Sequence, residues 1–213
     1  MNKQKFLEFK GFLGHAGHSY KCRSREAVES VHQKSKEQIL LLKERYKKQY
    51  PNLIISLGDT PGCSVSEDFY GVDEIRPGNF VFYDLTQNII GSNSLDEIAV
   101  AMACPIVAKH KTRNEIIIYG GGIHFSKDRI EDPEDGIIFG RVVEKKNKTW
   151  GPYIPKMFVK SLSQEHGIVS VPEAIFDGYK IGDLIWVLPV HSCMAADLMK
   201  KFYTADEEVI SMM

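Results

Sequence analysis

The sequence predicts an α/β region followed by an all-β region. In residues 1–90, a short strand, a long helix and a buried strand follow one another, which is the order typical of a parallel α/β layer. In residues 91–213, strand-like segments are separated by Gly, Pro and Asn, and no long helix interrupts them, which is typical of an antiparallel β domain. The domain boundary is therefore expected near residue 90.

The predicted α/β region begins with a strand and a long helix. The segment "FLEFKGFLGHAG" (6–17) indicates a strand that runs into a loop rich in Gly and His. Ser24 is a suitable N-cap for a helix over 25–49, and Pro51 ends it because proline cannot continue a helix. Four apolar positions keep a helical period between charged residues: Val28, Val31, Leu42 and Tyr46.

Two further strands are expected before residue 90. "NLIISLG" (52–58) is short and apolar enough for a buried strand, and a loop follows it at Asp59–Gly62. "IRPGNFVFYD" (75–84) predicts a turn followed by a strand. A β/α barrel of eight units takes about 250 residues, so this region supplies too few units to close one. The sequence therefore predicts either part of a barrel or a layer that something else completes, because a lone parallel layer leaves its edges unpaired.

Five strand-forming segments are expected in the all-β region. A polar turn at Lys111–Arg113 joins the first two, and Gly, Pro and Asn separate the others. The segments are 98–110, 114–125, 136–146, 157–171 and 183–190.

Composition excludes several functional classes. The chain has 213 residues, 27 Lys plus Arg against 28 Asp plus Glu, and a net charge of −1, without the basic surplus of a nucleic-acid-binding protein. No window approaches the roughly 20 apolar residues of a membrane span, and the first ten residues lack the apolar core of a signal peptide. Four scattered cysteines favour a reduced, cytoplasmic setting over a disulfide framework.

A candidate metal site lies near the end of the chain. "VLPVHSC" places His191 and Cys193 two positions apart after an apolar run. In an extended segment, residues i and i+2 point to the same side, so both side chains could reach one ion. Imidazole and thiolate suit Zn²⁺, and two protein ligands leave positions open for substrate or water, as in catalytic sites. The alternative is a half-buried histidine beside a buried free cysteine, without a metal.

Two loops of the α/β region are candidate ligand sites. In "GHAGHSY" (14–20), small residues let a ligand approach the backbone, while His15 and Tyr20 offer stacking and hydrogen bonds. Thr60 follows a buried parallel strand, where α/β folds bind ligands, and with local N–H groups it could hold a phosphate. The alternative for both segments is a tight loop without a ligand.

Two further segments carry polar groups. Arg76 offers a cationic donor to an anion, and Gly78 and Asn79 offer backbone amides. Glu165 and His166 could form an acid/base pair or support a metal ligand.

The order of these motifs resembles the D-serine dehydratase and D-threonine aldolase family, which consists of pyridoxal-phosphate enzymes of the alanine-racemase fold type. The resemblance covers nearly the whole chain, and the pattern PxHxC with an upstream EHG is its most specific part. It implies the last units of an alanine-racemase-like β/α barrel over 1–90, an antiparallel β domain over 91–213, and a dimer with composite active sites. The segments that carry it are "GHAGHSY", "SLGDTPGCS", "VDEIRPGNFVFYD", "YGGGIHFSKD", "SQEHGIV" and "VLPVHSC".

For the metal, the resemblance implies that His191 and Cys193 are the two protein ligands of a catalytic zinc. Glu165 and His166 match the segment that lies close to this metal in the family. D-threonine aldolases tend to carry Asp at the position of Cys193, so the cysteine favours the dehydratases.

For the cofactor, the resemblance implies that Tyr20, with His15 behind it, lines the pyridoxal ring. Arg76 lies where alanine racemases place an arginine on the pyridine nitrogen. The residues that match the phosphate cradle are Thr60, Gly78 and Asn79.

The Schiff-base lysine of the family is not matched in this sequence. In the family it lies on the first barrel strand, within an Arg-Pro-His-x-Lys-like segment, upstream of anything present here. Lys111 is followed by Thr112, as in that segment, but it falls in the turn expected between two strands of the all-β region. The chain alone is therefore expected to be inactive.

The sequence thus predicts the C-terminal portion of a pyridoxal-phosphate- and zinc-dependent lyase that converts D-β-hydroxy amino acids such as D-serine to a 2-oxo acid and ammonia. Two alternatives stay open: retro-aldol cleavage of the D-threonine aldolase type, and a non-catalytic metal-binding fragment or one subunit of a split enzyme. The expected partners are a D-amino acid and either a second copy of the chain or a chain that supplies the missing barrel half. A small β binding module without a cofactor would require the order of the motifs to be coincidental.

Overall fold

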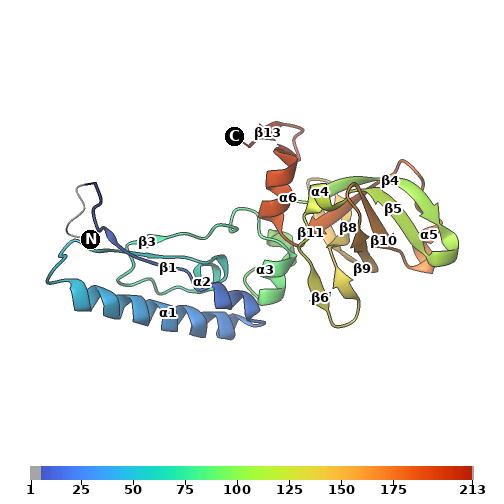
Figure 1. Cartoon of the computed structure of the whole chain (residues 1–213). Coiled ribbons are helices and arrows are strands. Elements are labelled where there is room, and N and C mark those ends of the chain that lie inside the picture. Colours follow the sequence, from blue (N-terminus) through green and yellow to red (C-terminus); the bar gives the residue numbers. More distant parts are fainter. Residues whose placement is uncertain (1–5, 213) are drawn as a thin grey trace. The chain divides into compact units, whose positions relative to one another are not determined.

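The computed structural model describes residues 6–212 and divides into two compact units (Figure 1). The N-unit consists of Met1–Phe80 and Gln87–Asn93, and the C-unit of Val81–Thr86 and Ser94–Met213. The helix α3, Leu85–Ile90, contributes residues to both. Among the helices that the structure describes, none is both long enough and apolar enough to cross a membrane.

A three-stranded parallel sheet and one long helix form most of the N-unit. The strand order is β1-β2-β3, and each neighbouring pair is parallel, as the strand, helix, strand order of the sequence predicts. The elements are β1 Gly11–Gly14, a 3-10 helix Gly17–Lys21, α1 Arg25–Tyr46, β2 Ile54–Leu57, α2 Thr60–Val65 and β3 Glu74–Ile75.

The long helix α1 confirms the helix predicted from residue 25. The Ser24 hydroxyl accepts a hydrogen bond from the Ala27 amide and so caps the helix as expected. The helix ends at Tyr46, three residues earlier than predicted. The predicted apolar face is only partly right, because Leu42 is exposed and two polar side chains face inward. The buried positions of α1 are Val28, His32, Lys36 and Ile39.

The strand predicted over 75–84 is wrong. Only Glu74–Ile75 pairs with β2, and residues 78–82 form a turn. Pro77 has no N–H to donate to a ladder. Tyr83 has a φ of 47°, in the left-handed region that strands do not contain. The apolar run at 80–83 therefore belongs to a turn, and two of its members, Phe80 and Val81, are exposed.

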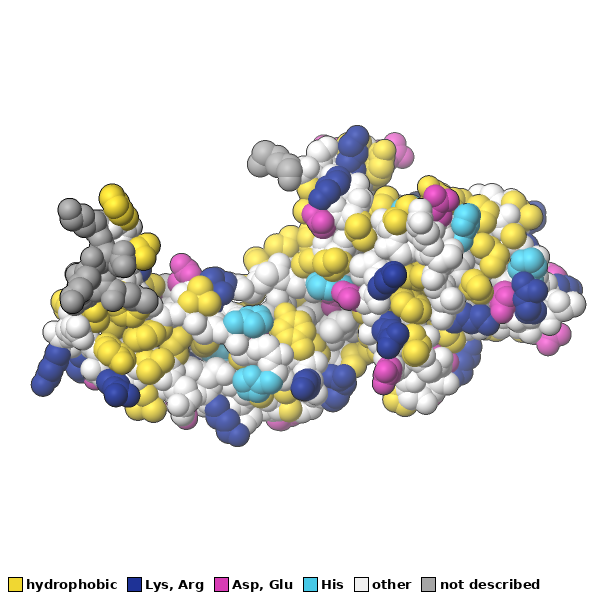
Figure 2. All heavy atoms as spheres, viewed as in Figure 1, with side chains coloured by type: hydrophobic (Ala, Val, Ile, Leu, Met, Phe, Trp, Pro, Cys, Tyr) yellow, Lys and Arg dark blue, Asp and Glu magenta, His cyan; other side chains and the backbone are white. Residues whose placement is uncertain are grey.

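The helix α1 covers one face of the sheet, and the described residues leave the other face open. On the covered face, Ile55 is 0% exposed, and Ile39 of α1 lies where a side chain on Gly14 would meet it. On the open face, Leu13 and Ile54 are 69% and 43% exposed. Figure 2 shows hydrophobic side chains at the surface of this unit. Parallel sheets are normally covered on both faces, so the N-unit has a face that still requires a cover.

Six antiparallel strands close into a barrel in the C-unit, in the order β10-β5-β4-β11-β8-β9 (Figure 1). Closure leaves no barrel edge unpaired. The interior is a continuous apolar core in which Ile116, Ile118 and Val187 are 0% exposed. The strands are β4 Met102–His110, β5 Glu115–Tyr119, β8 Gly140–Lys146, β9 Thr149–Leu162, β10 His166–Ser170 and β11 Leu184–Pro189.

Short elements connect and flank the barrel strands. The turn predicted at Lys111–Arg113 is a 3-10 turn between β4 and β5. The antiparallel character expected for this part of the chain is confirmed. The remaining elements are a 3-10 turn Leu95–Glu97, α4 Gly122–Phe125, β6 Ile130–Asp132, β7 Gly136–Ile138, α5 Glu173–Phe176, α6 Ser192–Met199, β12 Lys201–Tyr203 and β13 Val209–Ser211.

Candidate functional site

In the N-unit, the candidate cofactor residues follow the carboxyl ends of the neighbouring strands β1 and β2. Asp59 organises this region, because its carboxylate accepts a hydrogen bond from the Gly62 amide at 2.7 Å and one from the Ser19 hydroxyl at 2.8 Å. It thereby caps α2 and ties the loop after β1 to the loop after β2. The plain loop expected at Asp59–Gly62 is wrong, since α2 begins at Thr60. Asp followed by Thr-Pro is an N-cap signal that could have indicated this helix.

Thr60, Asn79 and Tyr20 are brought together beside this cap. The Asn79 amide donates a hydrogen bond to Thr60 Oγ1 at 2.9 Å, and both residues are buried. The Tyr20 hydroxyl hydrogen bonds to Thr60 and to Gln87, and burial raises the pKa of Tyr20 above its usual value. Gln87 was not a sequence candidate, because it lies in a different segment of the chain and no motif marks it.

His15 and Gly78 are the two other candidate cofactor residues of this region. The Nδ1 atom of His15 lies 2.6 Å from the Gly58 carbonyl oxygen and donates to it, since the carbonyl can only accept. The His15 ring centroid is 6.4 Å from that of Tyr20. A Cβ atom on Gly78 would meet no other atom within 4 Å, so the backbone there borders open space. The loops therefore leave room beside the polar cluster.

Arg76 ties the carboxyl ends of β1 and β2 together. Its Nη2 atom donates to the Gly14 carbonyl at 2.7 Å, and its Nε atom donates to the Ser56 hydroxyl at 2.6 Å. The Glu74 carboxylate lies 3.6 Å from Nε. The guanidinium is thus engaged within the sheet, and the contact with a cofactor ring that the sequence predicted stays a prediction.

In the C-unit, His191 and Cys193 lie at the start of α6 and not in an extended segment. His191 is the N-cap residue, and Cys193 belongs to the first turn. The argument from residues i and i+2 of a strand is therefore wrong, because β11 has already ended at Pro189. The two side chains nevertheless hydrogen bond to each other, so a single ion could contact both.

His191 has a second partner, Asp128. The Nδ1 atom of His191 lies 2.6 Å from Asp128 Oδ2. The hydrogen bond with Cys193 and, after it, the bond with Asp128 and the charge of Asp84 raise the pKa of His191 to about 9, although burial lowers it. The ring thus lies among electron-rich groups that stabilise a positive charge on it, so a metal would have to displace the proton held there.

The backbone at the start of α6 is fixed by the segment that enters the C-unit. The Ser192 amide donates to Asp84 Oδ2 at 3.1 Å, and the Ser192 hydroxyl donates to the Tyr83 carbonyl. Asp84 is 1% exposed. Sequence reasoning assigned Asp84 to a strand end and overlooked Asp128, since no local pattern links either residue to His191.

Glu165 and His166 lie where β9 turns into β10, beside the segment that follows β5. The His166 ring centroid is 5.8 Å from that of Tyr119, which in turn is 4.9 Å from that of His124. A Cβ atom on Gly121 would lie 2.5 Å from the main chain at 164–166, so only glycine permits this close approach. The metal-supporting role expected for Glu165 and His166 stays a prediction, because the hydrogen-bond partners described above for His191 are Cys193 and Asp128.

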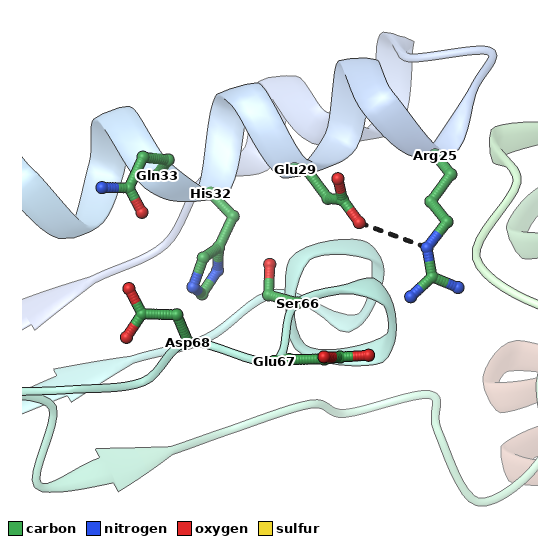
Figure 3. A pocket seen from close by; sticks show the side chains of 7 residues that line it. All are labelled: Arg25, Glu29, His32, Gln33, Ser66, Glu67 and Asp68. Atoms are coloured by element: carbon green, nitrogen blue, oxygen red, sulfur yellow. Dashed lines mark hydrogen bonds and ion pairs between the residues drawn. The ribbon is translucent and has the colours of Figure 1, made fainter.

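A shallow cavity of about 470 Å³ opens elsewhere in the N-unit, between α1 and the segment after α2 (Figure 3). Figure 3 shows His32 directed from α1 toward the segment with Ser66 and Asp68, while Glu29 pairs with Arg25 at 3.2 Å. Burial lowers the pKa of His32. None of the predicted site residues borders this cavity. Its lining residues are Arg25, Glu29, His32, Gln33, Ser66, Glu67 and Asp68.

The donor atoms at the start of α6 fit a zinc ion. Imidazole and thiolate are preferred zinc ligands, and the His191 side chain is 40% exposed, which leaves space for ligands that are not protein. In residues 6–212, no group of three or more His, Cys, Asp or Glu side chains is arranged to hold a metal. A metal here would therefore have fewer protein ligands than the four of a structural zinc site, which leaves positions open, as in a catalytic site.

The N-unit cluster fits the phosphate end of a pyridoxal cofactor. Thr60 and Asn79 supply buried polar groups, and Gly78 borders open space next to them. Lys111 lies in the turn that the sequence predicts between two strands of the C-unit and pairs with Asp177 at 2.6 Å.

Comparison with known sequences identifies the family. A family model described as "Putative serine dehydratase domain" matches residues 99–205, half of the chain. D-serine dehydratase of Dictyostelium discoideum is 29% identical over 218 residues, covering 95% of this chain and 52% of that protein. The chain thus spans about half the length of the curated relatives it matches.

Solved structures share the fold. D-threo-3-hydroxyaspartate dehydratase from Delftia sp. HT23 superposes with a TM-score of 0.85 at 23% identity, covering 96% of this chain and 55% of that one. D-threonine aldolase from Filomicrobium marinum superposes with a TM-score of 0.68 at 12% identity, covering 95% of this chain and 51% of that one. With the strand topology, the ordered motifs and the family match in agreement, the chain belongs to the serine dehydratase domain family.

Proposed function

We propose that the chain is the carboxyl-terminal half of a pyridoxal-phosphate- and zinc-dependent lyase that removes the β-hydroxyl of D-β-hydroxy amino acids such as D-serine. The similarity to dehydratases of D-hydroxy amino acids supports the substrate class. The observation that carries the proposal is the contact between His191 and Cys193 at the start of α6, within the family domain. Solved forms of the Delftia dehydratase include a metal-free cysteine mutant and a histidine mutant whose positions are two residues apart, the spacing seen here.

The proposal gives each residue a defined task. Bound pyridoxal phosphate would supply electron withdrawal from the α-carbon, and zinc would supply Lewis acidity toward the departing hydroxyl. His191 and Cys193 would hold the metal as neutral imidazole and thiolate, so both must lose a proton on metal binding. Thr60 and Asn79 would hold the phosphate. A hydroxyl can donate one hydrogen bond and accept two, so Thr60 can contact the phosphate while it hydrogen bonds to Tyr20.

The N-unit is proposed to be the last part of a β/α barrel. Its three parallel strands, the edge position of β1 and the exposed side chains of Leu13 and Ile54 all support this reading. The missing barrel part would cover the open face and bring the catalytic lysine that this sequence does not match. It would come from an upstream segment or from a second chain, in a dimer with composite active sites.

Retro-aldol cleavage is the second candidate reaction. The D-threonine aldolase superposes less closely than the dehydratase, with TM-scores of 0.68 and 0.85, and Cys193 departs from the aldolase pattern. Both observations favour β-elimination. A non-catalytic metal-binding fragment, or one subunit of a split enzyme, is the alternative that the unmatched lysine favours.

Complementation tests the proposal. The chain is co-expressed with the half of the Dictyostelium D-serine dehydratase that it does not cover, and the purified complex is loaded with pyridoxal phosphate and zinc. We expect ammonia release from D-serine or D-threo-3-hydroxyaspartate, no acetaldehyde from D-threonine, and loss of turnover in His191→Ala but not in the control His110→Ala. A loaded complex that keeps full turnover in His191→Ala, or that releases only acetaldehyde, would contradict the proposed reaction.

A further inference from the structure

The hydrogen bond between His191 and Asp128 decides which nitrogen of the imidazole is available to a metal. Asp128 Oδ2 lies 2.6 Å from His191 Nδ1, and the two residues are 63 positions apart in the chain. An ionised carboxylate can only accept hydrogen bonds, so Nδ1 must carry the proton. In the neutral ring the lone pair is then on Nε2, which faces away from Asp128.

We propose that Asp128 is a positioning residue that fixes the ring orientation and tautomer of His191 for metal binding. This inference rests on the proposed function, since it requires the metal site at His191 and Cys193. Histidines that bind metals almost always donate their other N–H group to a carboxylate, a carbonyl or a water, which holds the ring and makes the free nitrogen a stronger donor. Asp128 meets that requirement, since its carboxylate accepts from Nδ1 of His191.

The loop that carries Asp128 is built to hold it in place. It follows α4, whose Phe125 is 2% exposed within the barrel core. Ser126 then adopts a φ of 69° and a ψ of −170°, a conformation that is rarely found for residues other than glycine. Two hydrogen bonds support it: the Ser126 amide donates to the Gly122 carbonyl at 3.0 Å, and the Asp128 amide donates to Ser126 Oγ at 3.1 Å. The strained residue therefore directs the next turn of chain toward α6.

Asp84, the other carboxylate near His191, has a different role. Its Oδ2 atom accepts from the Ser192 amide at 3.1 Å, so it holds the backbone of α6 and contributes to His191 only by its charge. The side chain of Asp128 contacts the ring itself. Removing the Asp128 side chain should therefore leave the helix in place and affect only the orientation of the ring.

The test is zinc affinity, measured on the full metal-free chain by competition with a chromophoric chelator. We expect Asp128→Ala to weaken zinc binding by about 10- to 100-fold, the usual effect of removing such a partner. Asp128→Asn keeps a neutral acceptor for Nδ1 and should fall between Asp128→Ala and the unaltered chain. Glu131→Gln is the matched control, since Glu131 is exposed and lies three positions after Asp128. Its substitution removes the same charge. This variant should bind zinc as the unaltered chain does.

A second readout separates ring positioning from a general effect on folding. Cobalt(II) replaces zinc as a spectroscopic probe, and its ligand-field absorption reports the geometry of the bound ligands. We expect the Asp128→Ala spectrum to differ from that of the unaltered chain, and Asp128→Asn to restore most of it. Thermal unfolding without metal, followed by tryptophan fluorescence, should change little in any variant, because the His191–Asp128 pair is partly exposed.

Three outcomes would overturn the inference. Equal zinc affinity in Asp128→Ala and the unaltered chain would show that the ring needs no positioning by Asp128. Equal weakening in Glu131→Gln would assign the effect to net charge. If the unaltered chain binds no zinc, the metal site itself is wrong and the positioning role falls with it, which distinguishes a failure of the proposed function from a failure of this inference.

Discussion

The two units of this chain differ in how completely they bury their apolar residues. In the C-unit, six strands close on themselves, and core residues such as Ile118 are 0% exposed. In the N-unit, three parallel strands leave one face open, with Leu13 69% exposed. The unit that carries the candidate metal ligands is therefore complete by itself, whereas the unit that carries the candidate cofactor residues needs further structure.

The largest expected effect of this difference is on autonomous folding. Both tryptophans, Trp150 and Trp186, belong to the C-unit, so tryptophan fluorescence reports that unit alone. The 22-residue helix α1 belongs to the N-unit and dominates the helical circular dichroism. We expect a fragment of residues 81–213 to unfold at a clearly higher urea concentration, followed by fluorescence, than a fragment of residues 1–93, followed by circular dichroism. Equal midpoints in the two fragments would mean that the open face needs no cover.

Truncation of single side chains sharpens the same comparison. Ile118→Ala removes atoms from the closed barrel core and should lower the free energy of unfolding by about 2–5 kcal/mol. Leu13→Ala should cost less than about 0.5 kcal/mol in the chain alone, because its side chain is already exposed. Urea titration of the full chain measures both changes in the free energy of unfolding. Fluorescence follows Ile118→Ala, and circular dichroism follows Leu13→Ala. In a complex with the proposed barrel half, Leu13→Ala should become as costly as a core truncation.

A smaller effect is expected from acid on the N-unit. The Ile55 amide, which donates to Asp73 Oδ2 at 2.8 Å, and then the Lys43 ammonium hold the pKa of Asp73 below its usual value. A carboxyl with a lowered pKa adds stability above its unfolded pKa of about 3.9, and this is lost as the pH falls through the folded value. Because the group is largely exposed, the contribution is at most about 1 kcal/mol.

We therefore expect Asp73→Asn to flatten the loss of N-unit stability between about pH 5 and pH 2. Circular dichroism in urea at several pH values measures it, and the tryptophan signal is the internal control. An unchanged pH profile in Asp73→Asn, or an equal change in the tryptophan signal, would argue against this role.

The smallest effect is expected at Lys111. Its ammonium pairs with Asp177 in an exposed turn of the C-unit, whereas the candidate cofactor residues described above belong to the N-unit. Lys111→Met should leave the unfolding midpoint and the binding of pyridoxal phosphate unchanged. Borohydride reduction of chain and cofactor, followed by peptide mass spectrometry, checks this. Specific labelling at Lys111 would instead identify it as a cofactor lysine.

Features that depend on residues close together in the sequence could be predicted, and features that depend on distant residues could not. The helix from residue 25 and the antiparallel strands follow from local periodicity and a cap at Ser24, so they could be predicted. The strand at 75–84 could not be excluded, because a left-handed residue at Tyr83 leaves no mark in the pattern.

The candidate metal site was predictable only in part. The types and spacing of His191 and Cys193 indicated a metal, but the helical geometry that joins them did not follow from the sequence. The partners Asp128 and Asp84 come from segments 63 residues or more away and depend on the folded chain. Long-range hydrogen bonds of this kind have no sequence signature without a structure.

The central claim is that His191 and Cys193 form a zinc site within the complete C-unit, and one measurement tests it directly. Thermal unfolding of the metal-free chain is followed by tryptophan fluorescence, with and without zinc. Zinc at a hundred times its dissociation constant should stabilise the C-unit by about 2.7 kcal/mol. The helical circular dichroism, which reports the N-unit, should not change. The account predicts that His191→Ala and Cys193→Ala lose this stabilisation. The same stabilisation in both variants, or none in the unaltered chain, would contradict it.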